Sequence, residues 1–208
     1  MTYDLLMEQG LMEYEIKAQN IGYKIVAGVD EAGRGPLAGP VVAAAVVLTK
    51  GVKLNSLDDS KKLSARKRVE LFPKIQTMSH GIAVIGQEII DDINILQATR
   101  LAMKQAVEKI MINPDILLID GNQKIDSPIE QWTIVKGDAK SFSIAAASVL
   151  AKVTRDRLMD EYHQQYPQYE FARHKGYGTQ RHRELIVRHG PCPLHRKTFR
   201  GVSEHINP

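Results

Sequence analysis

The sequence is poor in cysteine and in long apolar runs, and each shortage excludes a class of protein. One cysteine among 208 residues, Cys192, excludes an intrachain disulfide framework and a cysteine-rich zinc site. No apolar run approaches the roughly 20 residues that a membrane-spanning helix needs. The acidic, amphipathic first 19 residues lack the basic, apolar and small-residue regions of a secretory signal. We therefore expect a protein of the reducing cytoplasm that makes no contact with membranes.

Basic residues gather at the end of the chain. The formal net charge is +4, yet residues 173–208 alone carry eight Lys and Arg against two acids. The remaining residues carry 20 basic and 22 acidic groups, so the body of the chain is nearly neutral. A basic end on a neutral body indicates a polyanionic partner such as nucleic acid, and a solvated basic surface is an equally good interpretation of charge alone.

Apolar periodicity predicts alternating strands and helices. Strands are expected at 24–30, 41–48, 81–89, 115–120 and 132–137. Helices are expected at 3–19, 65–77, 95–112, 141–163 and 179–189. Ser64, Asn94 and Thr179 stand where N-caps are expected. Three strands followed by alternating helix and strand predict a mixed α/β sheet with helices on its faces.

The domain organisation expected from this pattern is a single domain over residues 1–208. The α/β core spans about 1–164, and a basic, helical C-terminal part spans about 165–208. The sequence contains no internal repeat and no low-complexity segment. No heptad pattern or large apolar stripe indicates an oligomer, and no motif identifies a protein partner, so a monomer is the expectation.

Acidic residues stand at the ends of three predicted strands. Asp30 and Glu31 close the first strand, Asp120 closes the fourth, and Asp138 follows the fifth. Neighbouring strand ends can bring such residues together, and the clustered like charges then need a compensating cation. Taken singly, Asp120 is better explained by a turn before Gly121, and Asp138 by a helix cap. Together with the adjacent Asp30–Glu31 pair after an apolar strand, the functional interpretation is favoured.

Hard divalent cations fit such a cluster best. Mg²⁺ and Mn²⁺ prefer oxygen ligands, and no thiolate set or regular histidine spacing competes for another metal. Two such ions about 3.5–4 Å apart activate water and stabilise the leaving oxygen in phosphodiester hydrolysis. The sequence therefore predicts a two-ion Mg²⁺ or Mn²⁺ site.

Several blocks of the sequence together resemble one family. "DEAGRGPLAGPVVAAAV" is similar to the signature of type 2 ribonuclease H, specifically bacterial ribonuclease HII. The later blocks "LDDSKKLS", "LLIDGN", "KGDAKSFSIAAASVLAKVTRDRLM" and "HKGYGT" resemble that family in order and at suitable spacing. The resemblance covers residues from about 24 to 200.

This resemblance implies a ribonuclease H-like fold, in which helices flank a mixed five-stranded sheet and a helical part follows at the C-terminus. It also implies a metal-dependent endonuclease that hydrolyses the RNA strand of RNA–DNA hybrids and cuts 5′ to single ribonucleotides in duplex DNA. The products carry 3′-hydroxyl and 5′-phosphate ends, and the role is removal of misincorporated ribonucleotides and RNA primers. The family's four metal-binding, catalytic carboxylates fall on Asp30, Glu31, Asp120 and Asp138.

The substrate-binding positions implied by the resemblance are Gly33, Arg34, Gly35 and Tyr177. Glycine lets a backbone approach a ribose 2′-hydroxyl closely, and an arginine fork can hold the adjacent phosphate. Without the resemblance, a surface turn would explain the glycines and core packing would explain the tyrosine. Further candidates for phosphate contacts are Lys61, Lys62, Arg181, Arg183, Arg196 and Lys197.

Two other functions remain open at this level. A structure-selective DNA resolvase of the same fold would use these carboxylates without reading a 2′-hydroxyl. A basic module that only binds nucleic acid would keep the acids for structural reasons, although clustered negative charge near phosphates gives a pure binder no advantage. For His174, near Tyr177, a structural role is expected.

Overall fold

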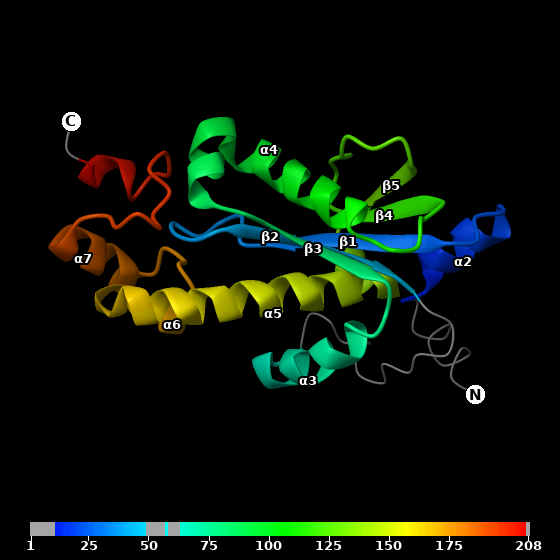
Figure 1. The fold of residues 1–208 in the computed structure, drawn as a ribbon, viewed down its shortest axis with the longest axis horizontal. Helices are drawn as coiled ribbons and strands as arrows, with labels where there is room; N and C mark the ends of the chain where they lie inside the picture. Colours follow the sequence, from blue (N-terminus) through cyan, green and yellow to red (C-terminus); the bar gives the residue numbers. More distant parts are fainter. Residues whose placement is uncertain (1–10, 49–56, 58–62, 207–208) are drawn as a thin grey trace.

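Helices pack on both sides of a five-stranded sheet in the computed structural model, which describes residues 11–48, 57 and 63–206 (Figure 1). The strands are β1 (Val26–Ala32), β2 (Val41–Val47), β3 (His80–Ile85), β4 (Ile116–Asp120) and β5 (Glu130–Ile134). Their order is β3-β2-β1-β4-β5, with β1–β2 and β2–β3 antiparallel and β1–β4 and β4–β5 parallel. The predicted mixed sheet, including the antiparallel first pair, is confirmed.

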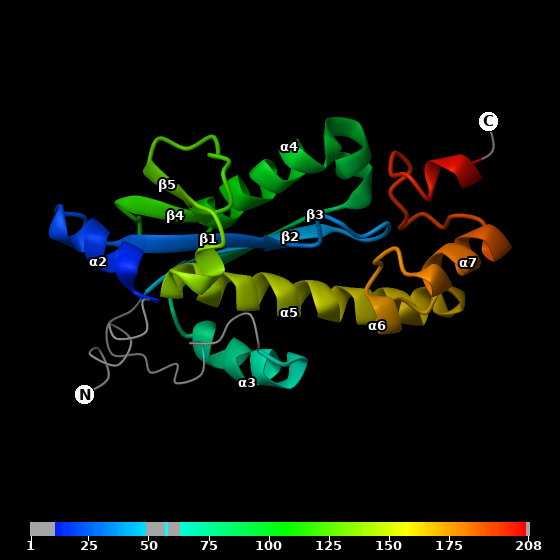
Figure 2. The same cartoon turned by 180° about the vertical axis from the view of Figure 1, so that it is seen from behind.

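The helices lie in two layers and one terminal group. They are α2 (Glu13–Asn20), α3 (Ala65–Ile75), α4 (Gln87–Glu108), α5 (Phe142–Gln165), α6 (Phe171–His174) and α7 (Gln180–His189). Short 3₁₀ turns are η2 (Gly137–Ala139), η3 (Pro167–Tyr169) and η4 (Ser203–His205). Helix α4 covers one face of the sheet and α5 the other, with α3 outside α5 (Figures 1 and 2). Helices α6 and α7 lie with the end of the chain at one end of the sheet.

Local side-chain chemistry sets several helix ends as predicted. The Ser64 hydroxyl accepts a hydrogen bond from the Lys67 N–H at 3.2 Å, and Thr179 caps α7 in the same way. Asn94 also caps, because its side-chain oxygen accepts from the N–H of Leu96 at 3.0 Å. The predicted start of that helix at 95 is confirmed, because Asn94 has a non-helical backbone (φ 65°, ψ 163°) at a kink that separates it from a preceding helical segment beginning at Gln87.

Two other predicted boundaries shift for physical reasons. The last strand ends at Ile134 instead of 137, because Lys136 has a left-handed backbone (φ 58°) that starts the η2 turn. The N-terminal helix begins at Glu13, and the expected helical residues 3–10 lie outside the described part of the chain.

The central strands are buried on both faces, which explains their continuous valine and alanine composition. All seven residues of β2 are buried. Gly28 of β1 lies directly against the start of α5, since a Cβ there would be 2.1 Å from the carbonyl carbon of Ser143. This close approach holds α5 beside the end of β1 where the acidic pair stands. No helix of the described residues is both long and apolar enough to cross a membrane.

Candidate active site

Two of the predicted acids stand side by side on adjacent parallel strands, Asp30 two residues before the end of β1 and Asp120 at the end of β4. Val29 of β1 pairs with Ile119 of β4, so Asp30 and Asp120 are the next residues on the two strands. Asp30 is only 6% exposed, and its Oδ1 accepts a hydrogen bond from the Glu31 N–H at 2.7 Å. The parallel pairing thus brings together acids that are 90 residues apart in sequence.

Asp138 lies close to Asp120 in the η2 turn. The four carboxylates Asp30, Glu31, Asp120 and Asp138 are together called the acidic edge. The N–H of Gly137 donates to Oδ1 of Asp120 at 2.6 Å, which fixes the turn against the end of β4. The charge of Asp138 raises the pKa of Asp120. The alternative role of Asp138 as the cap of the next helix is wrong, because the hydroxyl of Ser141 accepts from the Ile144 N–H at 3.3 Å and caps α5.

The crowded acids disfavour one another's ionised forms. Burial raises the pKa of Asp30 well above its ordinary value, and the charges of Glu31 and Asp120 raise it further. Burial also raises the pKa of Glu31, against the opposing effect of Arg34. Asp120 is likewise raised in pKa by burial, against the Gly137 hydrogen bond. A bound cation would relieve this excess of negative charge.

The donor chemistry of this edge fits a hard divalent ion. Asp30, Glu31, Asp120 and Asp138 offer only carboxylate oxygens, which Mg²⁺ and Mn²⁺ prefer. Asp30, Glu31 and Asp120 interact electrostatically with one another, and Asp120 also interacts with Asp138. Across the described residues, no three His, Cys, Asp or Glu side chains already form a group that could hold a metal ion.

A cavity of about 390 Å³ opens beside the acidic edge. Glu31 lines it together with Gly33, Arg34, Gly35 and Tyr177. Arg34 is half-exposed, and its Nη1 lies 3.4 Å from Oε1 of Glu31. The structure therefore brings Glu31 and all four predicted substrate-binding positions to one cavity.

The two glycines of this loop serve different ends. Gly33 has a backbone φ of +99°, and a Cβ there would lie 2.1 Å from Nε of Arg155, so the protein interior requires glycine. At Gly35 the nearest atom to a Cβ is Cε1 of Tyr177 at 4.0 Å. The space beside Gly35 is open, whereas at Gly33 the protein interior itself excludes a side chain. The predicted approach of this backbone to a ribose 2′-hydroxyl stays a prediction.

Tyr177 presents an exposed ring to the cavity. Its side chain is 42% exposed, so the alternative interpretation as core packing is wrong. Nζ of Lys152 and Cζ of Arg155 each lie 5.7 Å from the ring centroid. Because Tyr177 is 42% exposed, part of its ring is accessible to a sugar or a base.

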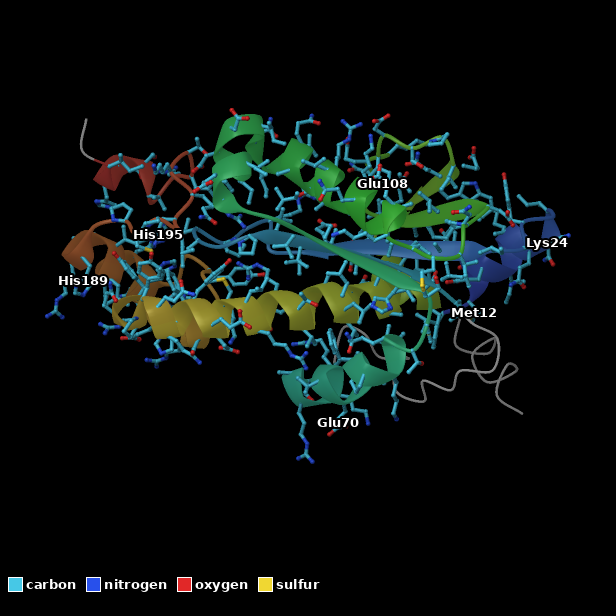
Figure 3. All side chains as sticks on the ribbon, in the orientation of Figure 1. Met12, Lys24, Glu70, Glu108, His189 and His195 are labelled. Carbon is cyan, nitrogen blue, oxygen red and sulfur yellow. The ribbon has the colours of Figure 1, made fainter. Side chains whose placement is uncertain are left out.

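A chain of buried histidines supports the Tyr177 backbone. Nδ1 of His182 lies 2.9 Å from the Tyr177 carbonyl oxygen, and Nε2 of His182 lies 3.1 Å from Nε2 of His195. Because a carbonyl only accepts, His182 donates through Nδ1 and accepts at Nε2 from His195. His195 then accepts the Cys192 N–H at Nδ1, at 2.9 Å. Figure 3 places His195 at the end of the molecule occupied by the C-terminal segment.

His174 belongs to the same cluster and is structural, as expected. Its ring stacks on His182 at 4.2 Å between centroids, and its Nε2 lies 2.7 Å from the Tyr169 carbonyl oxygen. Burial lowers the pKa of His182 to about 3 and that of His195 to about 4, and it lowers the pKa of His174 as well. The cluster is therefore neutral near pH 7.

We expect acid to destabilise the fold through these histidines. Between pH 6.5 and 4 the unfolded chain takes up protons that folded His182 and His195 do not, so the free energy of unfolding falls as pH falls. Each histidine contributes a slope of at most ~1.4 kcal/mol per pH unit. Urea unfolding at pH 7, 6 and 5 measures the slope. His182→Asn should flatten it and His205→Asn, at an exposed site, should not; equal slopes in both variants would contradict this account.

The predicted phosphate-contacting residues divide into four groups. The prediction that Arg196 contacts phosphate at the surface is wrong, because this residue has no exposed area. Arg181 is exposed but its Nε donates to Oε1 of Glu170 at 3.0 Å. Arg183 and Lys197 are exposed on the C-terminal part. Lys61 and Lys62 lie outside the described residues.

Sequence reasoning missed Ser148 and Arg155, both on α5. Ser148 makes a side-chain hydrogen bond that favours ionised Asp30, and it lines the cavity. Arg155 is fully buried beneath the loop that contains Gly33. The signal in the sequence was that Ser148 and Arg155 are polar residues on an otherwise apolar helix. Sequence alone cannot distinguish such residues from those on the solvent-facing side of the helix.

A mixed sheet of this order, with acids at the ends of its two central parallel strands, defines a nuclease of the ribonuclease H-like class. The family model for ribonuclease HII matches residues 27–202. A ribonuclease HII of Geobacter metallireducens is 55% identical over 208 residues, covering 99% of this chain and 98% of the relative. The chain belongs to the ribonuclease HII family.

Solved structures agree on the fold. The ribonuclease H2 of Pyrococcus horikoshii superposes with a TM-score of 0.73 at 26% identity, covering 87% of this chain and 96% of that one. Bst-RNase HIII, solved in complex with Mn²⁺, gives a TM-score of 0.67 at 19% identity, with 90% and 71% covered. The predicted fold and family are confirmed, and the chain is an endoribonuclease of the ribonuclease H type that acts on RNA–DNA hybrids.

Proposed function

We propose that this chain also cuts duplex DNA 5′ to a single embedded ribonucleotide, leaving 3′-hydroxyl and 5′-phosphate ends. The observation that carries the proposal is the shared cavity, in which Glu31 of the acidic edge adjoins the 33–35 loop and Tyr177. Hydrolysis and recognition of the sugar then take place within one site. The role that follows is removal of misincorporated ribonucleotides and RNA primers in the cytoplasm.

The reaction depends on Mg²⁺ or Mn²⁺ held by Asp30, Glu31, Asp120 and Asp138. When bound, two such ions activate water for attack on the phosphate and stabilise the leaving oxygen. The protein holds the acids in place with backbone donors, the Glu31 N–H on Asp30 and the Gly137 N–H on Asp120. The pKa values of Asp30, Glu31 and Asp120 are raised, so their ionised forms are disfavoured without a nearby cation. This supports a role for the three carboxylates in binding positive charge.

The 33–35 loop distinguishes ribose from deoxyribose. Its backbone approaches the 2′-hydroxyl, the group that separates RNA from DNA at a given nucleotide. Arg34 holds a neighbouring phosphate with its planar fork of donors, and Glu31 keeps the fork close to the acidic edge. The loop thereby aligns the phosphate 5′ to the ribonucleotide with the carboxylates.

Tyr177 packs its exposed ring on the sugar or base next to the ribonucleotide. Stacking of a base on an aromatic ring contributes ~1–3 kcal/mol, so Tyr177→Ala should lower kcat/KM on a single-ribonucleotide duplex about 10- to 100-fold. Tyr177→Phe retains the ring and should stay near the wild type. Steady-state kinetics on this duplex measure both variants. An alanine variant as active as the wild type would count against this role.

The C-terminal part and the α/β core act as one catalytic domain over residues 1–208, in this proposal. Tyr177 comes from residues 165–208 and Glu31 of the acidic edge from residues 1–164, and they meet at one cavity. A monomer is sufficient, because these groups come from one chain. No obligate protein partner is required.

Exposed Arg183 and Lys197 contact the phosphate backbone without reading sequence. Such contacts release counterions, so the apparent affinity for duplex should fall steeply between 50 and 200 mM salt, by about 10-fold or more. Fluorescence anisotropy of a labelled duplex across this range measures the dependence. An affinity that does not change with salt would contradict backbone binding.

An end-labelled duplex with one ribonucleotide tests the proposed reaction in Mg²⁺, in Mn²⁺ and in EDTA. The expected result is a single metal-dependent cut 5′ to the ribonucleotide, with no cut in an all-DNA duplex. Cutting of the all-DNA duplex would favour a DNA resolvase. Tight binding without any cut in either metal would favour a pure binding module.

A further inference from the structure

Two arginines without exposed area lie beneath the loop that lines the cavity. Arg155 comes from α5 and Arg196 from the segment after α7, and both are 0% exposed. Arginine is almost never fully buried unless it is paired with an acid. Within the described residues neither one has a carboxylate oxygen within 4 Å of its side-chain nitrogens. Their burial therefore needs another explanation.

Arg196 binds two carbonyl groups of the 33–35 loop and one carbonyl group of the segment that follows it. Its Nη2 donates to the Gly33 oxygen at 2.6 Å, its Nη1 to the Arg34 oxygen at 2.8 Å, and its Nε to the Gly39 oxygen at 3.0 Å. Its own backbone N–H donates to the Leu37 oxygen at 2.8 Å. A single rigid fork thus fixes two consecutive peptide units of the 33–35 loop.

The orientation of these peptide units determines what the loop offers on its other side. In a trans peptide the C=O and the N–H point in opposite directions, and the described residues contain no cis peptide. Because the carbonyls of Gly33 and Arg34 point at Arg196, the N–H groups of Arg34 and Gly35 point away from it. Gly35 faces Tyr177 and the cavity, while Arg196 does not line the cavity.

Arg155 links the residues just after the 33–35 loop to the segment that carries Tyr177. Its Nε donates to the Pro40 oxygen at 2.9 Å, its Nη2 to the Ala38 oxygen at 3.1 Å, and its Nη1 to the Lys175 oxygen at 3.0 Å. The guanidinium fills the space where a side chain at Gly33 would lie. Arg155 therefore links the segment that follows the 33–35 loop to the segment before Tyr177.

The buried positive charge is costly, and its environment shows that cost. Burial and, to a lesser extent, the neighbouring charge of Arg155 together lower the pKa of Arg196 to about 9. Asp91 opposes this effect, but its carboxylate accepts hydrogen bonds from the N–H groups of Lys197 and Thr198. Two adjacent cations held mainly by carbonyl oxygens give the loop above them a positive background that attracts an anion.

We propose that Arg196 is a positioning residue that orients the Arg34 and Gly35 N–H groups toward the ribose 2′-hydroxyl and its adjacent phosphate. Arg155 holds the Tyr177 segment in register with them. This inference rests on the proposed function of the 33–35 loop. Successive backbone N–H groups on one side of a bend form a concave site for anionic oxygens. The buried fork makes that site rigid before substrate arrives.

Arg196→Lys tests the inference, with Arg188→Lys as the matched control at an exposed position of α7. Lysine keeps the charge but cannot bind three carbonyls in a fixed plane. A misplaced loop should lower kcat/KM on the single-ribonucleotide duplex roughly 10- to 100-fold. The Mg²⁺ concentration for half-maximal rate should not change, because the acidic edge stays intact. A kcat/KM within twofold of the wild type, or a loss that follows weaker Mg²⁺ binding, would overturn the proposal.

A measurement on the wild-type protein decides the matter if the lysine variant does not fold. Amide NMR signals of Arg34 and Gly35 are followed on adding the single-ribonucleotide duplex or the all-DNA duplex in Ca²⁺. Both signals should shift more with the ribonucleotide, and equal shifts would overturn the inference. Failure of the wild type to cut the ribonucleotide duplex in Mg²⁺ or Mn²⁺ would instead overturn the proposed function, and this inference with it.

Discussion

Asp120→Asn is expected to lower the cleavage rate of an RNA–DNA hybrid by about 10³-fold, equivalent to ~4 kcal/mol of transition-state stabilisation. Asp120 is the acid that interacts electrostatically with Glu31, Asp30 and Asp138. Asparagine keeps the side-chain shape and an oxygen for the Gly137 N–H but removes the charge. Single-turnover cleavage at saturating Mg²⁺ measures the effect.

The same substitution should leave the fold intact or stabilise it, because one charge is removed from a group of mutually repelling acids. Asp126→Asn is the matched control, since Asp126 is exposed and pairs with Lys104 at 2.6 Å away from the cavity. The control should cleave at the wild-type rate. An Asp120→Asn protein that keeps more than about a tenth of the activity would contradict the catalytic role of this edge.

Gly28→Ala is expected to cause a loss of about 3 kcal/mol or more in the free energy of unfolding. A Cβ at Gly28 would lie 2.1 Å from the Ser143 carbonyl carbon and 2.2 Å from the Ile144 N, both backbone atoms of α5. A backbone cannot give way as a flexible side chain can, so α5 must separate from β1. Urea unfolding measures the loss, and cleavage should fall as well because α5 carries Ser148 beside Asp30.

Gly86→Ala is the control for this effect. Gly86 precedes α4 with an extended backbone, and nothing lies within 4 Å of a Cβ there. Its stability should stay within about 0.5 kcal/mol of the wild type. Equal losses in the two variants would show that the close contact between β1 and α5 does not limit stability.

The strands and the acids were predictable because their signals are local. Valine-rich runs mark strands that are buried on both faces, and acids at the ends of such runs stand out. Ser64 and Thr179 cap helices through contacts only three residues away. General rules for neighbouring strand ends predicted only that such acids can lie close together. The register of β1 and β4 in the structure is what places Asp30 beside Asp120.

The buried arginines were not predictable because their partners are distant. Arg196 binds carbonyl groups 157 to 163 residues earlier in the chain, and a sequence pattern describes it only as one more basic residue of the tail. The reason for glycine at position 33 was not predictable either, because the side chain that excludes a Cβ there is Arg155, which is distant in sequence. By contrast, Asn94 was predictable as a helix cap, because its side-chain oxygen accepts from the N–H groups of Leu96 and Gln97, two and three residues further on.

The most direct test of the account compares two duplexes that differ by one oxygen. One carries a single ribonucleotide and the other the matching deoxynucleotide, and single-turnover cleavage is followed in Mg²⁺ with the cut mapped by end label. The account predicts one cut 5′ to the ribonucleotide and none in the deoxy duplex. Equal cutting of both would contradict the claim that the 33–35 loop reads a 2′-hydroxyl next to the carboxylates.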